Sequence, residues 1–290
     1  MKVGICWPMT MDTARQRDLF FKWCERADET PLSSINVGDR IAYDSQEPLI
    51  SLAVAAGITK RIKLMTSVVA LPMRNTGLFA KQVASLDLLS GGRFALGVGM
   101  SSRPDDFAAL GVPWEDRAQQ FEKQIGELRE IWSGKSLVDG VAPIGPTPVT
   151  DGGPRIIVGA ISEAALRRAG RIADGIMTWS FKPEPDVQRA QIRITEESWR
   201  EAGRPGRPEI TAAMYFCLGD KAEDRLFSYL RHYYGYSELT RDRALLAQTC
   251  TPEQIKRAIQ SYADAGVDEI LFSAADASVD QIDRLVELLP

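Results

Sequence analysis

Short apolar runs alternate along this chain with longer segments in which apolar residues recur every three or four positions. The first pattern is typical of buried β-strands and the second of amphipathic helices. Strands are predicted at residues 2–7, 34–39, 62–71, 93–100, 155–160, 175–179, 209–219 and 269–274. Helices are predicted from about residue 13 and at residues 47–58, 76–89, 113–132, 162–173, 184–202, 252–266 and 279–288. Strands and helices therefore alternate through the whole chain.

Single residues sharpen this pattern. Pro48 falls in the first turn of its helix, where the missing N–H does no harm. Gly91 follows the helix at 76–89 and can supply a left-handed C-terminal cap. Gly97 and Gly99 lie inside a predicted strand, which glycine weakens. We therefore expect another group to approach the backbone closely at these two positions.

The order of the elements predicts the fold class. Strands that alternate with helices pair in parallel, and eight such units in a chain of this size favour an α/β fold of the closed (β/α)8 TIM-barrel type. An open doubly wound sheet is the alternative. Residues 221–250 are expected to form a helical insertion between strands seven and eight, and residues 134–154 an irregular loop. We expect residues 1–290 to form a single domain.

Composition excludes several classes of function. The 290-residue chain is 44% hydrophobic, carries a net charge of −4 and has no basic run, which argues against nucleic-acid binding. The N-terminus lacks the apolar segment of a signal peptide, and the longest apolar run is too short to span a bilayer. The four cysteines are scattered, as is typical of reduced thiols. We expect a cytoplasmic protein with no membrane partner.

The single histidine limits the chemistry further. No two cysteines form a C-x-x-C pair, so the chain lacks the spacing of a zinc site. A Ser-His-Asp triad could be built only around His232, and no G-x-S-x-G motif accompanies it. A hydrolase is therefore disfavoured, and His232 is more simply explained as a surface or hydrogen-bonded residue.

The C-terminal ends of the strands are where a barrel of this kind carries its active site. In chain order they present Trp7-Pro8, Gly38-Asp39-Arg40, Ser67-Val68, residues 99–102, Gly159-Ala160, Thr178-Trp179 and Ser273. This set has no histidine and no metal-ligand cluster, and it is rich in glycine, small hydroxyls and aromatic rings. Such a rim suits a large planar cofactor that supplies the chemistry while the protein positions it.

The segment "RIIVGAISEAALRR" suggests a phosphate site. It runs from a strand through Gly159-Ala160 to Ser162 at the start of a helix, where free backbone N–H groups attract anions. Ser162 could instead cap its own helix, and Glu163 in the first turn would repel a phosphate. From this segment both interpretations remain open.

Three stretches resemble the bacterial luciferase-like superfamily of flavin- and deazaflavin-dependent oxidoreductases. They are "TKRIKLMTSVVALPMRNTGLFAKQVASLDLLSGGRFALGVGM", "FAALGVPWEDRAQQFEKQIGELREIW" and "PRIIVGAISEAALRRAGRIADGIMTW". The succession of a strand, "LDLLSGGR" and "GVG" is specific to that superfamily. The resemblance covers nearly the whole chain and implies the (β/α)8 fold, which agrees with the independent strand count.

The resemblance also implies a flavin or deazaflavin, coenzyme F420, at the mouth of the barrel. It implies a non-prolyl cis peptide at Ser67-Val68 that supports one face of the ring. The residues on which the resemblance places the cofactor are Asp39, Ser67, Val68, Gly97, Gly99, Ser102, Trp179 and a phosphate-binding turn at Val158, Gly159, Ala160 and Ser162.

Two positions depart from the pattern of the superfamily. Many deazaflavin-using relatives carry Asp-His or Glu-His after the second strand, whereas this chain has Asp39-Arg40. The sugar-phosphate dehydrogenase branch has a glutamate after the fourth strand, near the place that Ser102 occupies here. A proton relay through histidine and the oxidation of sugar phosphates are therefore not expected.

The leading hypothesis is an F420-dependent oxidoreductase that transfers hydride between the ring and an unknown small organic substrate. Asp39 would hydrogen-bond or charge-balance the ring, and Arg40 would stabilise an anionic ring or orient the substrate. Both would be catalytic residues. The simpler alternative is that Asp39 and Arg40 form a local ion pair that closes the top of the barrel. Trp7 and Trp179 would line the pocket or pack in the core.

Two further hypotheses stay open. The chain could be an FMN-dependent monooxygenase of the same superfamily, or a flavin-binding relative without catalytic activity. The resemblance implies a homodimer, with the helices at 48–58 and 76–89 as the candidate surface. The tyrosines of the insertion are expected to shape the substrate side, or else to pack an amphipathic helix; they are Tyr229, Tyr233, Tyr234 and Tyr236.

Overall fold

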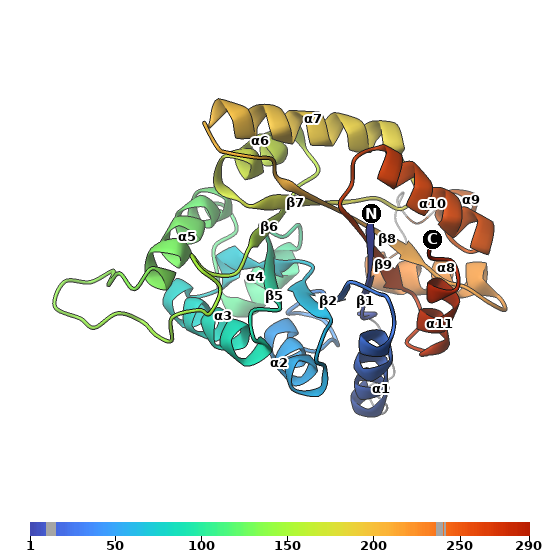
Figure 1. The fold of residues 1–290 in the computed structure, drawn as a ribbon, viewed down its shortest axis with the longest axis horizontal. Coiled ribbons are helices and arrows are strands. Elements are labelled where there is room, and N and C mark those ends of the chain that lie inside the picture. The colour runs from blue at the N-terminus through green and yellow to red at the C-terminus, as the bar shows by residue number, and fades with distance from the viewer. Residues whose placement is uncertain (10–15, 236–239, 241) are drawn as a thin grey trace.

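Parallel strands close into a barrel with eight strand positions (Figure 1). The computed structural model describes residues 1–9, 16–235, 240 and 242–290. The described strands are β1 (Lys2–Cys6), β2 (Ser34–Val37), β3 (Lys63–Thr66), β4 (Val69–Ala70), β5 (Phe94–Gly99), β6 (Ile156–Gly159), β7 (Gly175–Trp179), β8 (Glu209–Phe216) and β9 (Glu269–Ala274). β3 pairs with both β2 and β5, which closes the barrel. The predicted fold class is confirmed.

Helices surround the barrel, as the alternating pattern predicted (Figure 1). They are α1 (Gln16–Glu29), α2 (Pro48–Ile58), α3 (Thr76–Ser90), α4 (Pro104–Leu110), α5 (Arg117–Trp132), α6 (Glu163–Ile172), α7 (Pro185–Glu201), α8 (Ala222–Tyr234), α9 (Arg243–Leu246), α10 (Pro252–Asp264) and α11 (Asp280–Val286). The start predicted for the first helix, near residue 13, lies outside the described residues. No helix in the described ranges has the length and apolarity needed to cross a membrane.

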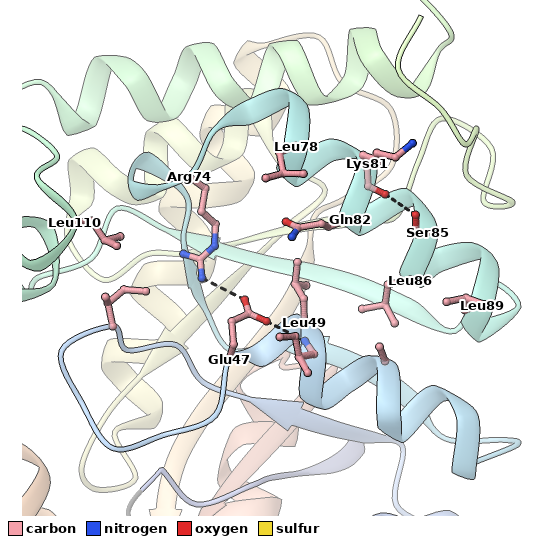
Figure 2. A pocket seen from close by; sticks show the side chains of 13 residues that line it. Glu47, Leu49, Arg74, Leu78, Lys81, Gln82, Ser85, Leu86, Leu89 and Leu110 are labelled. Carbon is pink, nitrogen blue, oxygen red and sulfur yellow. Dashed lines mark hydrogen bonds and ion pairs between the residues drawn. The ribbon is translucent and has the colours of Figure 1, made fainter.

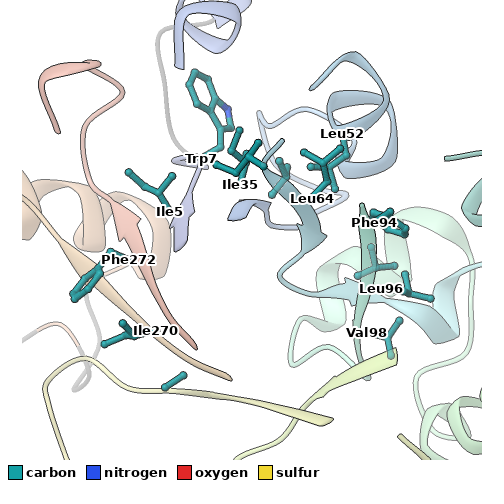
Figure 3. Close-up of a cluster of buried hydrophobic side chains, with 14 of the residues drawn as sticks. Ile5, Trp7, Ile35, Leu52, Leu64, Phe94, Leu96, Val98, Ile270 and Phe272 are labelled. Carbon is teal, nitrogen blue, oxygen red and sulfur yellow. The ribbon is translucent and has the colours of Figure 1, made fainter. Parts of the chain in front are cut away.

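Side chains along each strand alternate between the barrel interior and the surrounding helices. The interior holds a small cluster made of Cys6, Met65, Ile157, Met177, Ala213 and Leu271. Their chain neighbours, such as Ile5, Leu64 and Val158, belong to the larger cluster between strands and helices, part of which Figure 3 shows. Because both faces of the strands are buried, the strands have the continuous apolar runs that predicted them.

Pro48 and Gly91 lie where the sequence predicted them, and Glu47 and Asn75 add helix caps that it did not predict. Pro48 occupies the first turn of α2, and the side chain of Glu47 accepts a hydrogen bond from the N–H of Ile50. Asn75 caps α3 in the same way, and Gly91 ends it in the left-handed conformation with φ of 66°. These local hydrogen bonds satisfy N–H groups that have no partner inside the helix.

Two predicted elements differ from the structure. The third strand is not continuous, because Ser67 and Val68 bulge out between β3 and β4. The helix predicted from residue 113 begins at Arg117, since Trp114 packs edge-to-face on Phe107 with ring centroids 5.0 Å apart. Phe107 lies in α4, a short helix that the sequence pattern did not predict. Tertiary packing thus holds residues 113–116 out of the helix.

The predicted irregular loop and the predicted helical insertion lie at opposite parts of the barrel. The loop between α5 and β6, which includes residues 134–154, leaves the body of the protein (Figure 1). The predicted insertion contributes α8 and α9 between β8 and α10. α8 packs its apolar face against the end of β8, where it adds tyrosine side chains to the mouth of the barrel.

Candidate functional site

A cavity of about 510 Å³ lies at the C-terminal ends of the strands, and we call it the rim pocket. Its volume falls in the range of sites for small molecules and cofactors. The residues predicted for the site that line it are Asp39, Arg40, Ser67, Val68, Gly99, Ser102, Gly159, Ala160, Ser162 and Trp179. Gly97 and Val158 are not among its lining residues. Val158 points toward the helices instead, since the alternation along β6 sends Ile157 inward.

Val68 forms an apolar shelf in the rim pocket. The Ser67–Val68 peptide is cis, as the resemblance implied. A Cβ atom built on Gly99 would lie 2.8 Å from Val68 Cγ2, and one built on Gly159 would lie 3.2 Å from the same atom. At Gly97 a Cβ atom would lie 1.8 Å from the carbonyl oxygen of Thr66. The close approach predicted at Gly97 and Gly99 is therefore confirmed, and the approaching groups are the last carbonyl of β3 and the Val68 side chain of the bulge.

The Asp39 carboxylate lies beside the shelf and is held by donors of the protein. One of its oxygens accepts a hydrogen bond from the N–H of Ala70 at 2.9 Å, and the other accepts one from Arg74 Nη2 at 3.0 Å. The Asp39 side chain is 1% exposed. A buried carboxylate is stable only with such partners. Arg74, which the sequence analysis missed, thus balances the charge of Asp39.

Arg40 has a different set of partners. Its Nε donates to Asp106 and its Nη2 to Asp105, each at 2.8 Å. Asp106 also accepts hydrogen bonds from the backbone N–H groups of Ile41 and Ala42. Burial lowers the pKa of Arg40, but the hydrogen bond and charge of Asp106 outweigh it, so the pKa is raised.

The local ion pair between Asp39 and Arg40, offered as the simpler alternative, is therefore wrong. Each of the two residues is paired across the barrel mouth with another residue. The acidic pair after the fourth predicted strand, in the stretch "RPDD", was the available signal for the partner of Arg40. This signal could not be interpreted from the sequence, because only the closed barrel brings the loop after β2 close to the segment after β5.

Aromatic side chains form a second wall of the rim pocket. The ring of Trp179 lies 5.8 Å from that of Tyr215 and 5.9 Å from that of Tyr234, between centroids. The hydroxyls of Tyr215 and Tyr234 are 3.0 Å apart, and Tyr229 accepts a hydrogen bond from the N–H of Met9. Burial raises the pKa of all three tyrosines, so they remain neutral at physiological pH.

The tyrosines of the predicted insertion thus reach the pocket, with one exception. Tyr229, Tyr233 and Tyr234 line it, whereas Tyr236 lies outside the described residues. Tyr215 was missed, although the alternation along β8 places it inward two residues after Ala213. Trp7 both lines the pocket and packs edge-to-face on Phe20, so its two predicted roles coexist.

The turn after β6 shows the capping that the sequence analysis left open. Ser162 Oγ accepts a hydrogen bond from the N–H of Ala165 at 3.4 Å. Glu163 turns to Arg167, with 2.9 Å between Oε1 and Nε, and its side chain is 64% exposed. Because the Glu163 carboxylate is turned toward Arg167, it does not block the turn. The turn at Gly159, Ala160 and Ser162 therefore faces the pocket.

Few ionisable groups are available in the described lining of the rim pocket. Besides the groups above, it contains Arg103 and the Cys6 thiol, whose pKa burial raises to about 11. His232 is exposed and contacts the ring of Tyr43 rather than the pocket. Among the residues that the structure describes, none cluster as metal ligands. The site can therefore hold and orient a planar group, but it offers little acid–base chemistry near neutral pH.

Comparisons with known proteins agree with this geometry. Residues 1–248 match the model of the luciferase-like monooxygenase family. An uncharacterized protein of Mycobacterium tuberculosis is 28% identical over 251 residues, which cover 84% of this chain and 74% of that protein. The 5,10-methylenetetrahydromethanopterin reductase of Methanopyrus kandleri is 27% identical over 281 residues, 85% of this chain and 79% of the reductase.

Solved structures share the fold over the full length of the chain. An F420-dependent secondary alcohol dehydrogenase in complex with an F420-acetone adduct has a TM-score of 0.81 at 18% identity, with 100% of this chain and 99% of that chain covered. The oxygenating constituent of 3,6-diketocamphane monooxygenase from Pseudomonas putida, in complex with FMN, has a TM-score of 0.77 at 16% identity, with 99% and 95% covered.

Proposed function

The chain belongs to the luciferase-like monooxygenase family, and from this premise we propose that it transfers hydride between coenzyme F420 and a small organic substrate. At the coarser level it is a flavin- or F420-dependent oxidoreductase or monooxygenase. The finer proposal rests first on one observation: the rim pocket combines the Val68 shelf with an aromatic wall. Such a cavity fits a planar ring that carries the redox chemistry.

The residues of the pocket fit a tricyclic cofactor with a phosphate-bearing side chain. When bound, F420 supplies or accepts a hydride at C5 of its ring. Val68 would support one face of that ring, with Gly99 and Gly159 leaving room for the shelf. The turn at Gly159, Ala160 and Ser162 would donate hydrogen bonds to the phosphate. Ser102 and Trp179 would contact the edge of the ring.

Asp39 and Arg40 act in this proposal mainly by holding the mouth of the barrel in shape. Their side chains are 1% and 6% exposed, and their charges are already paired with Arg74, Asp105 and Asp106. Asp39 can still accept one more hydrogen bond from the ring, since a carboxylate has about four acceptor sites.

Two observations favour F420 over FMN. The reductase of Methanopyrus kandleri aligns with 85% of this chain, and the solved tetrahydromethanopterin reductase of that organism is described as coenzyme F420 dependent. The rim pocket also reaches solvent beside Ser102, which is exposed. Hydride exchange tolerates such an opening, whereas oxygen activation requires a site from which water is excluded. The FMN-dependent monooxygenase remains the second candidate, because the shelf and the phosphate turn suit either ring.

A titration separates these functions. The purified full-length chain is titrated with F420 and with FMN, and the fluorescence quenching of each cofactor is followed. We expect saturable F420 binding and FMN binding weaker by at least about tenfold. Tight FMN binding without F420 binding would show the monooxygenase to be correct. Binding of F420 without turnover of any alcohol, ketone or enone in a substrate panel would instead support the non-catalytic alternative.

The partner that we propose is a second copy of the chain, docked on α2 and α3. A groove of about 600 Å³ runs between these helices (Figure 2), and Ile50, Leu78 and Leu89 along it are each more than half exposed. Figure 2 shows Glu47 paired with Arg74, at 3.5 Å, and Lys81 Nζ donates to the carbonyl oxygen of Gly145, so both charges already have partners. The exposed apolar side chains along the groove are left to pack against the same side chains of a second copy across a two-fold axis, which places the same patch on both chains.

Sedimentation tests this interface. We expect a dimer at micromolar concentration and a monomer after Leu78→Asp, because a carboxylate in the centre of the apolar groove would be desolvated without a partner. Val187→Asp changes a similarly exposed residue on α7 and serves as the matched control, which should leave the dimer intact. A monomeric native chain would rule the proposal out.

A further inference from the structure

Arg103 lies at the edge of the rim pocket in the loop between β5 and α4. Its backbone N–H donates to Ser101 Oγ at 3.1 Å, which fixes the loop, and Ser101 itself has a positive φ of 63°. The guanidinium carbon lies 5.3 Å from the ring centroid of Tyr233 and 5.2 Å from that of Tyr234. Stacking on two rings holds the cation beside the cavity that these residues line together.

The charge of Arg103 is not balanced by a carboxylate in the described part of the chain. No hydrogen bond or ion pair joins its guanidinium to a described residue, although the side chain is partly buried. The two acids that follow it in sequence, Asp105 and Asp106, are turned to Arg40 instead. Asp39 is held by Arg74. Of the charged side chains that line the rim pocket, Arg103 therefore keeps its donors available.

We propose that Arg103 binds an anionic group of the substrate, and that the substrate class is an aromatic or otherwise planar carboxylate. This inference rests on the proposed function, which it makes more specific. The planar fork of a guanidinium matches a carboxylate with two parallel hydrogen bonds. Tyr215, Tyr233, Tyr234 and Trp179 supply ring faces and edges for the apolar part of such a molecule.

The Arg103 guanidinium could instead bind the phosphate of a cofactor. An experiment can distinguish a cofactor phosphate from a substrate carboxylate as the anion at Arg103. The turn at Gly159, Ala160 and Ser162 already offers backbone donors for a phosphate, and it lies on a different strand end from Arg103. The carboxylate is therefore assigned to Arg103, and loss of cofactor phosphate binding in an Arg103 variant would count against this assignment.

The test compares a charged probe with its neutral isostere. The full-length chain, loaded with whichever cofactor it retains, is titrated with 2-naphthoate and with 2-naphthamide by calorimetry. Arg103→Met should weaken the binding of 2-naphthoate by about tenfold or more and the binding of 2-naphthamide by less than about twofold. Arg103→Lys keeps the charge without the fork and should give an intermediate loss. Arg117→Met is the matched control, since Arg117 also stacks on an aromatic ring, Trp114, outside the pocket.

Three outcomes would overturn the assignment. Equal weakening of both probes would mean that Arg103 contributes packing only. Unchanged 2-naphthoate affinity in Arg103→Met would mean that the anion binds elsewhere or not at all. Weaker binding of FMN but not of riboflavin, with 2-naphthoate unaffected, would assign Arg103 to a cofactor phosphate. If neither F420 nor FMN binds, the proposed function fails, while the probe pair still tests Arg103 on the chain alone.

Discussion

The contact between Gly99 and Val68 makes a quantitative prediction for Gly99→Ala. The new Cβ atom would lie 2.8 Å from Val68 Cγ2, whereas carbon atoms in contact prefer about 3.5 to 4.0 Å. Valine has few rotamers to choose from, and the same methyl group already lies against Gly159. Overpacking of this kind lowers the free energy of unfolding by about 1 to 3 kcal/mol. Because Val68 must move, we also expect cofactor affinity to fall.

A double-mutant cycle isolates this contact. Val68→Ala removes both γ-methyl groups, and the loss of buried apolar surface by itself lowers the free energy of unfolding by about 1 to 2 kcal/mol. In Gly99→Ala/Val68→Ala the clash is absent, so the combined loss should be smaller than the sum by about 1 kcal/mol or more. Urea denaturation followed by circular dichroism measures the free energy of unfolding of the native chain, the two single variants and the double variant. Gly126→Ala, in a helix with nothing within 4 Å of the added carbon, should stabilise the chain by about 0.5 to 1 kcal/mol.

The cycle can refute the reasoning in two ways. Additive losses would show that Gly99 and Val68 do not contact each other as the structure has them. A stable Gly99→Ala protein with unchanged cofactor affinity would show that the position of the shelf is irrelevant to the site. Either result would remove the main support for the placement of the ring.

Two further predictions concern charge. Arg40→Met leaves the buried Asp106 carboxylate without its cation and should lower the free energy of unfolding by about 3 kcal/mol. Arg284→Met breaks an exposed ion pair and should change that free energy by less than about 0.5 kcal/mol. Equal effects of the two substitutions in urea denaturation would contradict this reasoning. Burial raises the pKa of Cys6 and of Cys217 from 9.0 to about 11, so between these pH values the unfolded chain loses thiol protons that the folded chain keeps. The urea midpoint should therefore fall as pH rises from 9 to 11, and a midpoint that is flat or rises there would contradict the burial of these thiols.

The resemblance and the hydrophobic pattern predicted different parts of the site. Strand ends located Asp39, Val68, Gly99 and Trp179 on one rim, because parallel strands present their C-terminal ends together. The cis peptide at Ser67–Val68 came from the resemblance alone, since no periodicity distinguishes it from an ordinary strand. Gly97 and Val158, which the resemblance placed at the cofactor, do not line the rim pocket, because a motif match does not say which face of a strand a residue occupies.

The sequence by itself determined the alternation of strands and helices and the scarcity of acid–base groups at the strand ends, and its count of eight strands favoured a barrel over an open sheet. These follow from local periodicity and from residue types, which do not depend on distant neighbours. Only the tertiary structure decided how the charges are paired. Asp39 is bound by Arg74, and Arg40 by Asp105 and Asp106, through loops that barrel closure brings together. Among the described residues, no carboxylate pairs with Arg103 for the same reason, since ion pairs form between residues that are close in space rather than in sequence.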